Sequence, residues 1–242
     1  MTTLARAMEA LASDDAQLRQ QAALVLGTVD TSSVQERLVW AMASEPDPFV
    51  RETLVWAVVA QPVAATPVLV AALQGDLPRE PVLHALSKIG DPTTVGAILP
   101  HAASTDPVVA AKAWWALGRI ATDEGLTVLL AHLGSDKAEL RHGLTRALLQ
   151  YGAAAIDPLG RALAHDDAAV RSHAAEVLVA FADPSRYGTV ERRTGQDFSA
   201  RAAEVLRTAT APEVDGALLL ATVTDDRPGL TQAAQQLRDQ RG

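Results

Sequence analysis

The 242-residue chain repeats one short pattern along its length. The pattern is an Asp, then an apolar residue followed by Arg, then a pair of small residues such as Ala-Ala, and then a Leu. It recurs in segments such as "DDAQLRQQAALVLGTV" from Asp14, "PDPFVRETLVWAVVA" from Pro46 and "HDDAAVRSHAAEVLVAFAD" from His165. A recurrence of this kind is typical of an array of similar structural units, each of which packs only on its neighbours.

The Arg position of the pattern sets the length of the unit. Its successive occupants are spaced by 28 to 32 residues, and they are Arg19, Arg51, Arg79, Ala110, Arg141, Arg171 and Ser199, with Leu230 as a weak eighth. Each unit also has an apolar helical stretch upstream, such as "SSVQERLVWAMA". Its second helix is predicted to begin at an Asp N-cap, often followed by Pro. The sequence therefore predicts an all-α solenoid of about eight helical hairpins, forming a single domain over residues 1–242.

The pattern can be written D-x-x-V-R-x-x-A-A-x-x-L-G-x-I-G-D, and it is clearest in "PREPVLHALSKIGD" and "AVRSHAAEVLVAFAD". It resembles the HEAT repeat family, in particular the short HEAT-like repeats first named from phycobilisome lyases. The resemblance extends from residue 3 to about residue 240. It implies that the second helices line a concave surface. Because this architecture serves adaptors, enzymes and nucleic-acid binders alike, it does not by itself decide the function.

The composition narrows the class of protein further. Apolar residues make up 48% of the chain and aromatic residues only 4%, which favours closely packed helices over a β-sandwich. The chain has no cysteine, so disulfides and thiolate metal sites are excluded and a reducing, cytoplasmic location is expected. The uncharged stretch from Leu54 to Leu73 has about the length of a membrane span. Its Pro62 and Pro67 instead predict a break between two short helices, and no membrane association is expected.

Two features of the repeat are expected to be structural. The Arg of the pattern and the capping Asp are predicted to pair within or between neighbouring units and to fix their register. The segment "RYGTVERRTGQD", residues 186–197, departs from the pattern and predicts a locally irregular unit.

Helical periodicity separates the packed positions from the exposed ones. Counting from the Arg position, −1, +3, +4 and +7 are apolar or Ala and form the packed side, whereas +1, +2, +5 and +9 vary and form the exposed rows. In "AAKAWWALGRI" Trp114 falls at +4 and Trp115 at +5, so Trp115 is the expected contact residue. The +2 row also contains Pro81 and His173. The predicted partner-binding residues on the concave face are Trp56, His84, Lys88, Lys112, Trp115, Arg119, His142, Arg146, Glu52, Glu80 and Glu176.

The balance of charge points to a protein or peptide as the partner. The chain has 21 Lys and Arg against 29 Asp and Glu, a net charge of −8, which argues against a general nucleic-acid binder. A central patch of basic and aromatic residues on this acidic chain favours an anionic or mixed-charge partner. The leading hypothesis is therefore a non-catalytic protein- or peptide-binding scaffold.

Motifs that would carry catalysis are missing from the sequence. None of the six histidines is followed by Glu, unlike the His-Glu pairs of di-iron hydroxylases built on HEAT repeats, and there is no His-x-x-x-His pair. No catalytic residue, metal ligand or cofactor is predicted. The alternative is a glycosylase-like or lyase-like enzyme that acts on a nucleic-acid base or a cofactor in the same groove. Glu52 or Glu80 near Trp56 would resemble the HEAT-like alkylpurine DNA glycosylases, and salt-sensitive binding to a DNA duplex would favour this alternative.

Overall fold

The computed structural model describes residues 2–135, 137–183, 197–224 and 227–241. These residues are helical apart from their turns, which confirms the predicted all-α helical-repeat fold. The chain packs as two compact units, residues 1–122 and 123–242. A single domain over the whole chain stays a prediction. The irregular unit expected at residues 186–197 lies almost wholly outside the described residues, which resume at Asp197.

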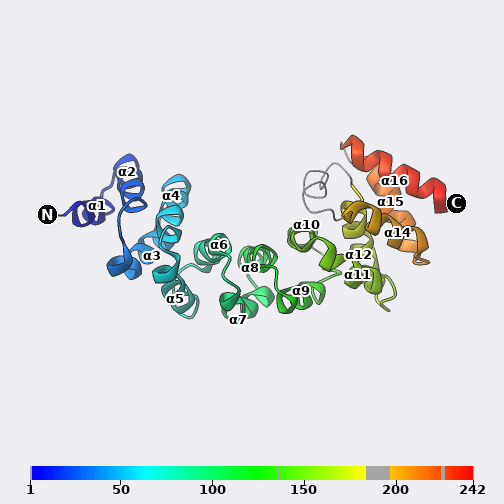
Figure 1. Ribbon diagram of the computed structural model, residues 1–242, viewed down its shortest axis with the longest axis horizontal. Coiled ribbons are helices and arrows are strands. Elements are labelled where there is room, and N and C mark those ends of the chain that lie inside the picture. Colours follow the sequence, from blue (N-terminus) through cyan, green and yellow to red (C-terminus); the bar gives the residue numbers. More distant parts are fainter. Residues whose placement is uncertain (1, 136, 184–196, 225–226, 242) are drawn as a thin grey trace. The chain divides into compact units, whose positions relative to one another are not determined.

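Unit 1 consists of four consecutive helical pairs. Their second helices follow one another along one side of the unit, and the first helices of the last three pairs follow one another along the other (Figure 1). The α-helices are α1 (Thr3–Ala10), α2 (Ala16–Leu26), α3 (Gln35–Ser44), α4 (Pro48–Val59), α5 (Pro62–Leu73), α6 (Arg79–Ile89), α7 (Val95–Ile98) and α8 (Pro107–Ile120). Short 3₁₀ segments are η1 (Ser32–Val34), η2 (Pro92–Thr94) and η3 (Leu99–Ala103).

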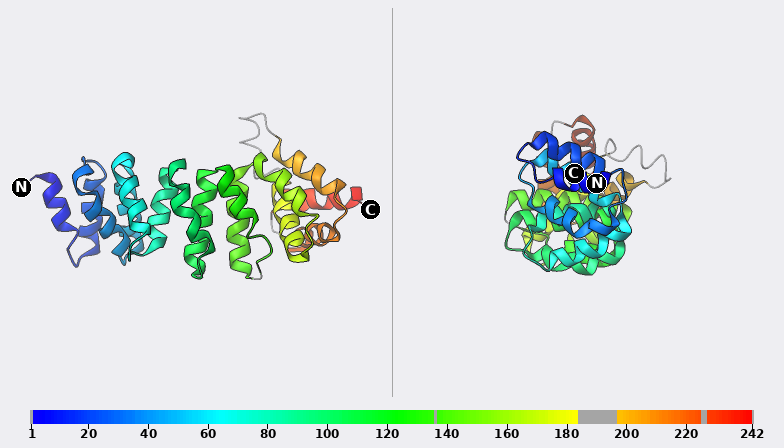
Figure 2. Two further views of the ribbon diagram at one scale, coloured as in Figure 1. Left: turned by 90° about the horizontal axis from the view of Figure 1, so that it is seen from below. Right: turned by 90° about the vertical axis from the view of Figure 1, so that its left-hand side faces the viewer.

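Unit 2 is also built from packed helices (Figure 2), but some of them pack on helices further along the chain as well as on their neighbours. Its helices are α9 (Asp123–Leu130), α10 (Ala138–Leu148), η4 (Leu149–Tyr151), α11 (Ala153–Ala162), α12 (Ala168–Phe181), α14 (Phe198–Thr208), α15 (Pro212–Thr224) and α16 (Pro228–Arg241). Seven helical pairs and α14 thus fall within the described residues, in accordance with the predicted number of about eight.

Aspartate caps fix where the second helices begin. The Asp47 carboxylate accepts hydrogen bonds from the backbone N–H groups of Phe49 (2.9 Å) and Val50 (3.1 Å), which have no partner inside the helix. Pro48 occupies the first turn, where the missing N–H costs nothing. The predicted Asp N-cap is confirmed at the start of second helices by Asp15, Asp47, Asp106, Asp167 and Asp197.

The packed side of the second helices follows the predicted positions. In α4 the −1, +3, +4 and +7 positions are Val50, Leu54, Val55 and Val58, and none is more than 2% exposed. In α8 the +4 residue Trp114 is 3% exposed. These side chains form the core between the two helices of each pair and between successive pairs.

The +2 row was wrongly assigned to the exposed side at two positions. Pro81 and His173 are both buried, and His173 has no exposed surface. The +2 position lies at the edge of the apolar stripe, so a small change in how successive second helices cross moves it into the interface.

The two prolines between Leu54 and Leu73 have different roles. Pro62 begins α5, as expected for a break after α4, but Pro67 lies inside α5 and does not end it. A proline at this position removes the hydrogen bond to the carbonyl four residues earlier, that of Val63. Val63 is 91% exposed, so water can donate to that carbonyl instead. No helix among the described residues is long and apolar enough to cross a membrane.

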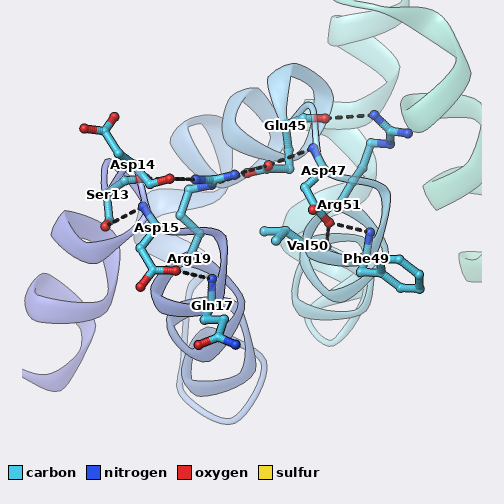
Figure 3. A network of polar contacts seen from close by, with 10 residues as sticks. All are labelled: Ser13, Asp14, Asp15, Gln17, Arg19, Glu45, Asp47, Phe49, Val50 and Arg51. Carbon is cyan, nitrogen blue, oxygen red and sulfur yellow. Dashed lines mark hydrogen bonds and ion pairs between the residues drawn. The ribbon is translucent and has the colours of Figure 1, made fainter.

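An arginine joins the first pair of helices to the second (Figure 3). The Arg19 side chain donates to both carboxylate oxygens of Glu45, at 2.9 and 2.8 Å, and to the carbonyls of Ser13 (3.0 Å) and Asp14 (3.1 Å). Glu45 lies at the end of α3, and its side chain is only 5% exposed. Burial opposes the ionisation of Glu45, but the hydrogen bonds and the charge of Arg19 outweigh it and lower the pKa of Glu45.

The same arginine position is used again in both units. Arg51 donates to the Glu45 carbonyl at 2.8 Å, and in unit 2 Arg171 donates to Glu213 at 2.7 Å and to the His165 carbonyl at 2.7 Å. The predicted pairing between successive helical pairs is therefore confirmed for Arg19. Its acidic partner was predicted wrongly, because the capping aspartates bind their own helix N-termini and Glu45 pairs with the arginine instead.

Candidate functional site

Eight of the predicted binding residues lie on the second helices of unit 1. Residues three, four, seven or eight apart share one side of a helix, so each of α4, α6 and α8 presents its members together. We call this surface the second-helix face; it comprises Glu52 and Trp56 of α4, Glu80, His84 and Lys88 of α6, and Lys112, Trp115 and Arg119 of α8.

Glu52 links α4 to α6. One of its carboxylate oxygens lies 3.0 Å from His84 Nε2, and the other accepts a hydrogen bond from Lys88 Nζ at 2.8 Å. Burial opposes ionisation of Glu52, but the hydrogen bonds from Lys88 and His84 outweigh it, and the pKa of Glu52 is lowered. Glu52 is therefore a carboxylate at neutral pH, held by two groups of the next second helix.

His84 is neutral at this face near pH 7. Burial, followed by the charge of Lys112, lowers the pKa of His84, and together they outweigh the opposing effect of Glu52. A neutral imidazole has one N–H, and its contact with the Glu52 carboxylate places that N–H on Nε2. Nδ1 is then an acceptor, and it is buried without a hydrogen-bond partner among the described residues.

Glu80 links α6 to α8. Its carboxylate accepts a hydrogen bond from Lys112 Nζ at 2.8 Å, and both side chains are about one-third exposed or less. A hollow of about 170 Å³ lies between the two linkages; it is lined by Pro48, Arg51, Glu52, Val55, Glu80, Pro81, His84 and Lys112. This lining presents charged groups of both signs but no hydroxyl or thiol nucleophile, so it is suited to binding ionic groups.

Trp56 supplies the aromatic surface at the α4 end of the second-helix face. Its ring lies directly over Gly27 at the end of α2, where a Cβ would fall 1.8 Å from the ring. The indole is 45% exposed, and Leu24 and Val25 of α2 are 51% and 38% exposed. The missing side chain of Gly27 lets the Trp56 ring approach α2 closely, and Trp56 still keeps almost half of its surface exposed.

The two adjacent tryptophans of α8 differ in burial, as predicted. Trp114 is buried, and its ring N–H donates to the Ala102 carbonyl at 3.0 Å, whereas Trp115 is half-buried. Arg119, one turn beyond Trp115, is exposed and has no hydrogen bond or ion pair to any residue that the structure describes. The α8 end of the face thus combines an aromatic ring with an available cation.

The remaining three predicted residues belong to unit 2. His142 and Arg146 are both exposed on α10, four residues apart and therefore on the same side. Glu176 of α12 forms an ion pair with Arg141, which links α12 to α10 in the way that Glu80 links α6 to α8. The single groove that would unite these three residues with the second-helix face stays a prediction.

Sequence reasoning missed a second surface of unit 1. A groove runs between α1 and α3, and its main aromatic residue, Trp40, is 62% exposed. Trp40 sits in the apolar first helix of its pair, where the repeat pattern predicts only packing. Its one sequence signal is a large aromatic residue three positions after an arginine, Arg37. Among the described residues no cluster of three or more His, Cys, Asp or Glu could hold a metal ion.

Comparisons with solved structures return other helical-repeat proteins. The complex of CpcE and CpcF of phycocyanin lyase from Nostoc sp. PCC7120 is 21% identical over all of this chain and 96% of that chain, with a TM-score of 0.45. Human deoxyhypusine hydroxylase is 18% identical over 98% of this chain and 95% of its own, with a TM-score of 0.41. An engineered protein is 21% identical over 100% and 97%, with a TM-score of 0.36. Neither these identities nor these scores bear on function.

A comparison with curated protein sequences finds no match. The family model for HEAT repeats matches residues 4–83 and 77–149, which together span more than half of the chain. These matches cover all four helical pairs of unit 1 and extend to the end of α10. The chain therefore belongs to the HEAT repeat family.

Proposed function

We propose that the protein is a non-catalytic binding module that holds a peptide or protein segment of mixed charge on the second-helix face of unit 1. HEAT repeats commonly mediate protein binding, and stacked helical pairs offer an extended surface for it. The observation that carries the proposal is a row of polar contacts between successive second helices, Glu52 with His84 and Lys88, and Glu80 with Lys112. This row lies between the exposed surface of Trp56 and Arg119, a cation with no hydrogen bond or ion pair to any described residue.

The chemistry of the partner follows from the order of groups along the face. Near α2 and α4 the surface is apolar, because Leu24 and Trp56 are both about half exposed. Near α6 and α8 it offers Lys88 and Arg119. Packed helices lie about 9 Å apart, so the two ends are about 20 Å from each other. A matching segment places an apolar side chain over Trp56 and a carboxylate near Arg119.

The linkages favour recognition of a segment with both signs of charge. A partner carboxylate can bind Lys88 while Glu52 keeps its contact with His84, so Glu52 is not left without a partner. A partner cation can bind the exposed part of Glu52, whose side chain is 55% exposed. Exposed pairs of this kind contribute little affinity each, so they set specificity while the aromatic contact supplies most of the binding energy.

The test is to select 16-residue peptides from a displayed library on the wild-type protein and to measure the dissociation constants of the best binders. Trp56→Ala should weaken binding by about tenfold or more, the loss typical of an interface hot spot. Phe49→Ala is the matched control, since Phe49 is a 75% exposed aromatic of the same helix that lies outside the face. Equal weakening by both variants, or by neither, would contradict the proposal.

A further inference from the structure

The groove between α1 and α3 is formed by three hollows that share residues. Their volumes are about 360, 470 and 410 Å³. The first two share Met8, Ala12 and Arg37, and the first and third share Leu11, Trp40 and Ala41. The hollows therefore form one continuous groove, here called the α1–α3 groove.

The groove exists because α1 packs differently from the other first helices of unit 1. α3 packs on the next first helix, α5, and on its own partner, α4. α1 packs on its partner α2 but not closely on α3, and the groove lies between α1 and α3. Figure 2 shows α1 at the N-terminal edge of the unit. The surface that another first helix would cover on α3 is left open here, and it includes Trp40.

Large apolar side chains line the walls of the groove, and small residues line its floor. Met8 and Leu11 come from the α1 side and Trp40 from α3, while Ala12 and Ala41 leave room for close approach. Trp40 is 62% exposed, and an exposed aromatic side chain in an apolar groove is typical of an interaction site. Because only helices border the groove, no sheet edge is available to pair with an extended backbone. An occupant must satisfy its own backbone hydrogen bonds, which a helix does.

The charges around the groove are mainly acidic. Glu9, Asp14 and Glu36 contribute three carboxylates, against one cation, Arg37. Arg19 also borders the groove, but its charge is matched by Glu45. The net charge of this rim is therefore about −2 by formal count, which complements a basic partner.

We infer that the α1–α3 groove is a docking site for a basic amphipathic helix of a partner protein. α3 has ten residues, so at 1.5 Å per residue the groove is about 15 Å long and accommodates about three turns of helix. The apolar side chains of the partner contact Trp40, Met8 and Leu11, and its Lys or Arg residues face Glu9 and Glu36. This site is separate from the second-helix face, and neither proposal depends on the other.

The probe is a synthetic 14-residue helical peptide with Leu at helical spacing and Lys elsewhere. Two comparison peptides carry Glu in place of Lys, or the same composition with the Leu positions scrambled. The Lys peptide should bind the wild-type protein, and the two comparison peptides should bind at least about tenfold more weakly. Tight binding of the scrambled peptide would overturn the inference, because it would show a non-specific attraction to the acidic protein.

Two substitutions place the binding in the groove. Trp40→Ala should weaken binding of the Lys peptide by about tenfold or more, and Phe49→Ala should leave it unchanged. Glu36→Lys should weaken the Lys peptide by about fivefold and strengthen the Glu peptide, whereas Glu124→Lys, the same charge change at an exposed position of unit 2, should do neither.

The charge reversal keeps the inference testable if Trp40→Ala lowers the stability of the protein. If Glu36→Lys left the affinities for the Lys peptide and the Glu peptide unchanged, the inference would be overturned. Val63→Ala, at a 91% exposed position of α5 outside both surfaces, should leave Lys-peptide binding unchanged, and a loss there equal to that in Trp40→Ala would also contradict the assignment to the groove.

Discussion

Replacing Trp114 by Ala should strongly destabilise unit 1. The side chain is 3% exposed, so its removal leaves a cavity, and Trp→Ala substitutions in cores cost about 3 to 5 kcal/mol. The Ala102 carbonyl also loses its donor at 3.0 Å and is itself buried, which adds about 1 kcal/mol. The expected loss in the free energy of unfolding is about 4 to 6 kcal/mol.

Trp115→Ala is the matched comparison, because the two residues are neighbours of the same type. Trp115 is half-buried, so its truncation should cost about 1 to 2 kcal/mol. Trp114→Phe keeps most of the ring volume and loses the hydrogen bond to Ala102, which should cost about 2 kcal/mol. These values predict that the wild type is the most stable, that Trp115→Ala and Trp114→Phe are less stable, and that Trp114→Ala is the least stable.

Urea titration followed by tryptophan fluorescence measures this order for unit 1 alone, because all four tryptophans lie in residues 1–122. With a slope of about 2 kcal/mol per molar urea, Trp114→Ala should lower the midpoint by about 2 M or more. Trp40 and Trp56 remain as probes in each variant. Equal losses for Trp114→Ala and Trp115→Ala would refute the assignment of packed and exposed positions.

Three further predictions concern other contacts. His173 is buried, and its pKa is lowered to about 4, first by burial and then by the charge of Arg141. The folded state therefore favours the neutral imidazole, which contributes about 3 kcal/mol to stability. This contribution is complete above pH 6.5 and is lost as the pH falls from 6.5 towards 4. Circular dichroism of the wild type and His173→Gln should show a flatter pH dependence of unfolding in the variant over this window. Gly27→Ala should displace the Trp56 ring, seen as a red-shifted tryptophan emission and a lower thermal midpoint. Arg19→Ala should destabilise unit 1 more than the double variant Arg19→Met, Glu45→Gln, because only the single variant leaves the buried Glu45 carboxylate without its arginine. A lower urea midpoint for the double variant than for the single variant would contradict this.

The sequence predicts the fold well because its repeat carries both the helical period and the caps. Asp47 followed by Pro48 indicates a helix start, and the structure confirms it. The separation of Trp114 from Trp115 also follows from periodicity, since one position around a helix is a rotation of about 100°. Features that depend on a single helix are therefore predictable from the sequence alone.

Features that depend on how helices cross each other are not predictable in this way. His173 lies at the edge of the apolar stripe, so only the packing of α10 on α12 decides that it is buried. Pro67 lies inside α5, four residues after the 91% exposed Val63, whereas the local rule that proline ends a helix predicts a break there. The α1–α3 groove depends on the distance between two first helices, and the repeat pattern is the same whether that distance is short or long.

The most direct test of the proposed binding surface is a charge reversal with a matched control. The dissociation constant of a library-selected peptide should be measured for the Lys88→Glu, Arg119→Glu double variant and for Arg6→Glu, Lys137→Glu, which changes one Lys and one Arg at exposed positions outside the second-helix face. The first variant should bind about tenfold or more weakly, and the second within about twofold of the wild type. Equal weakening in the two variants would show that overall charge, and not the second-helix face, governs binding.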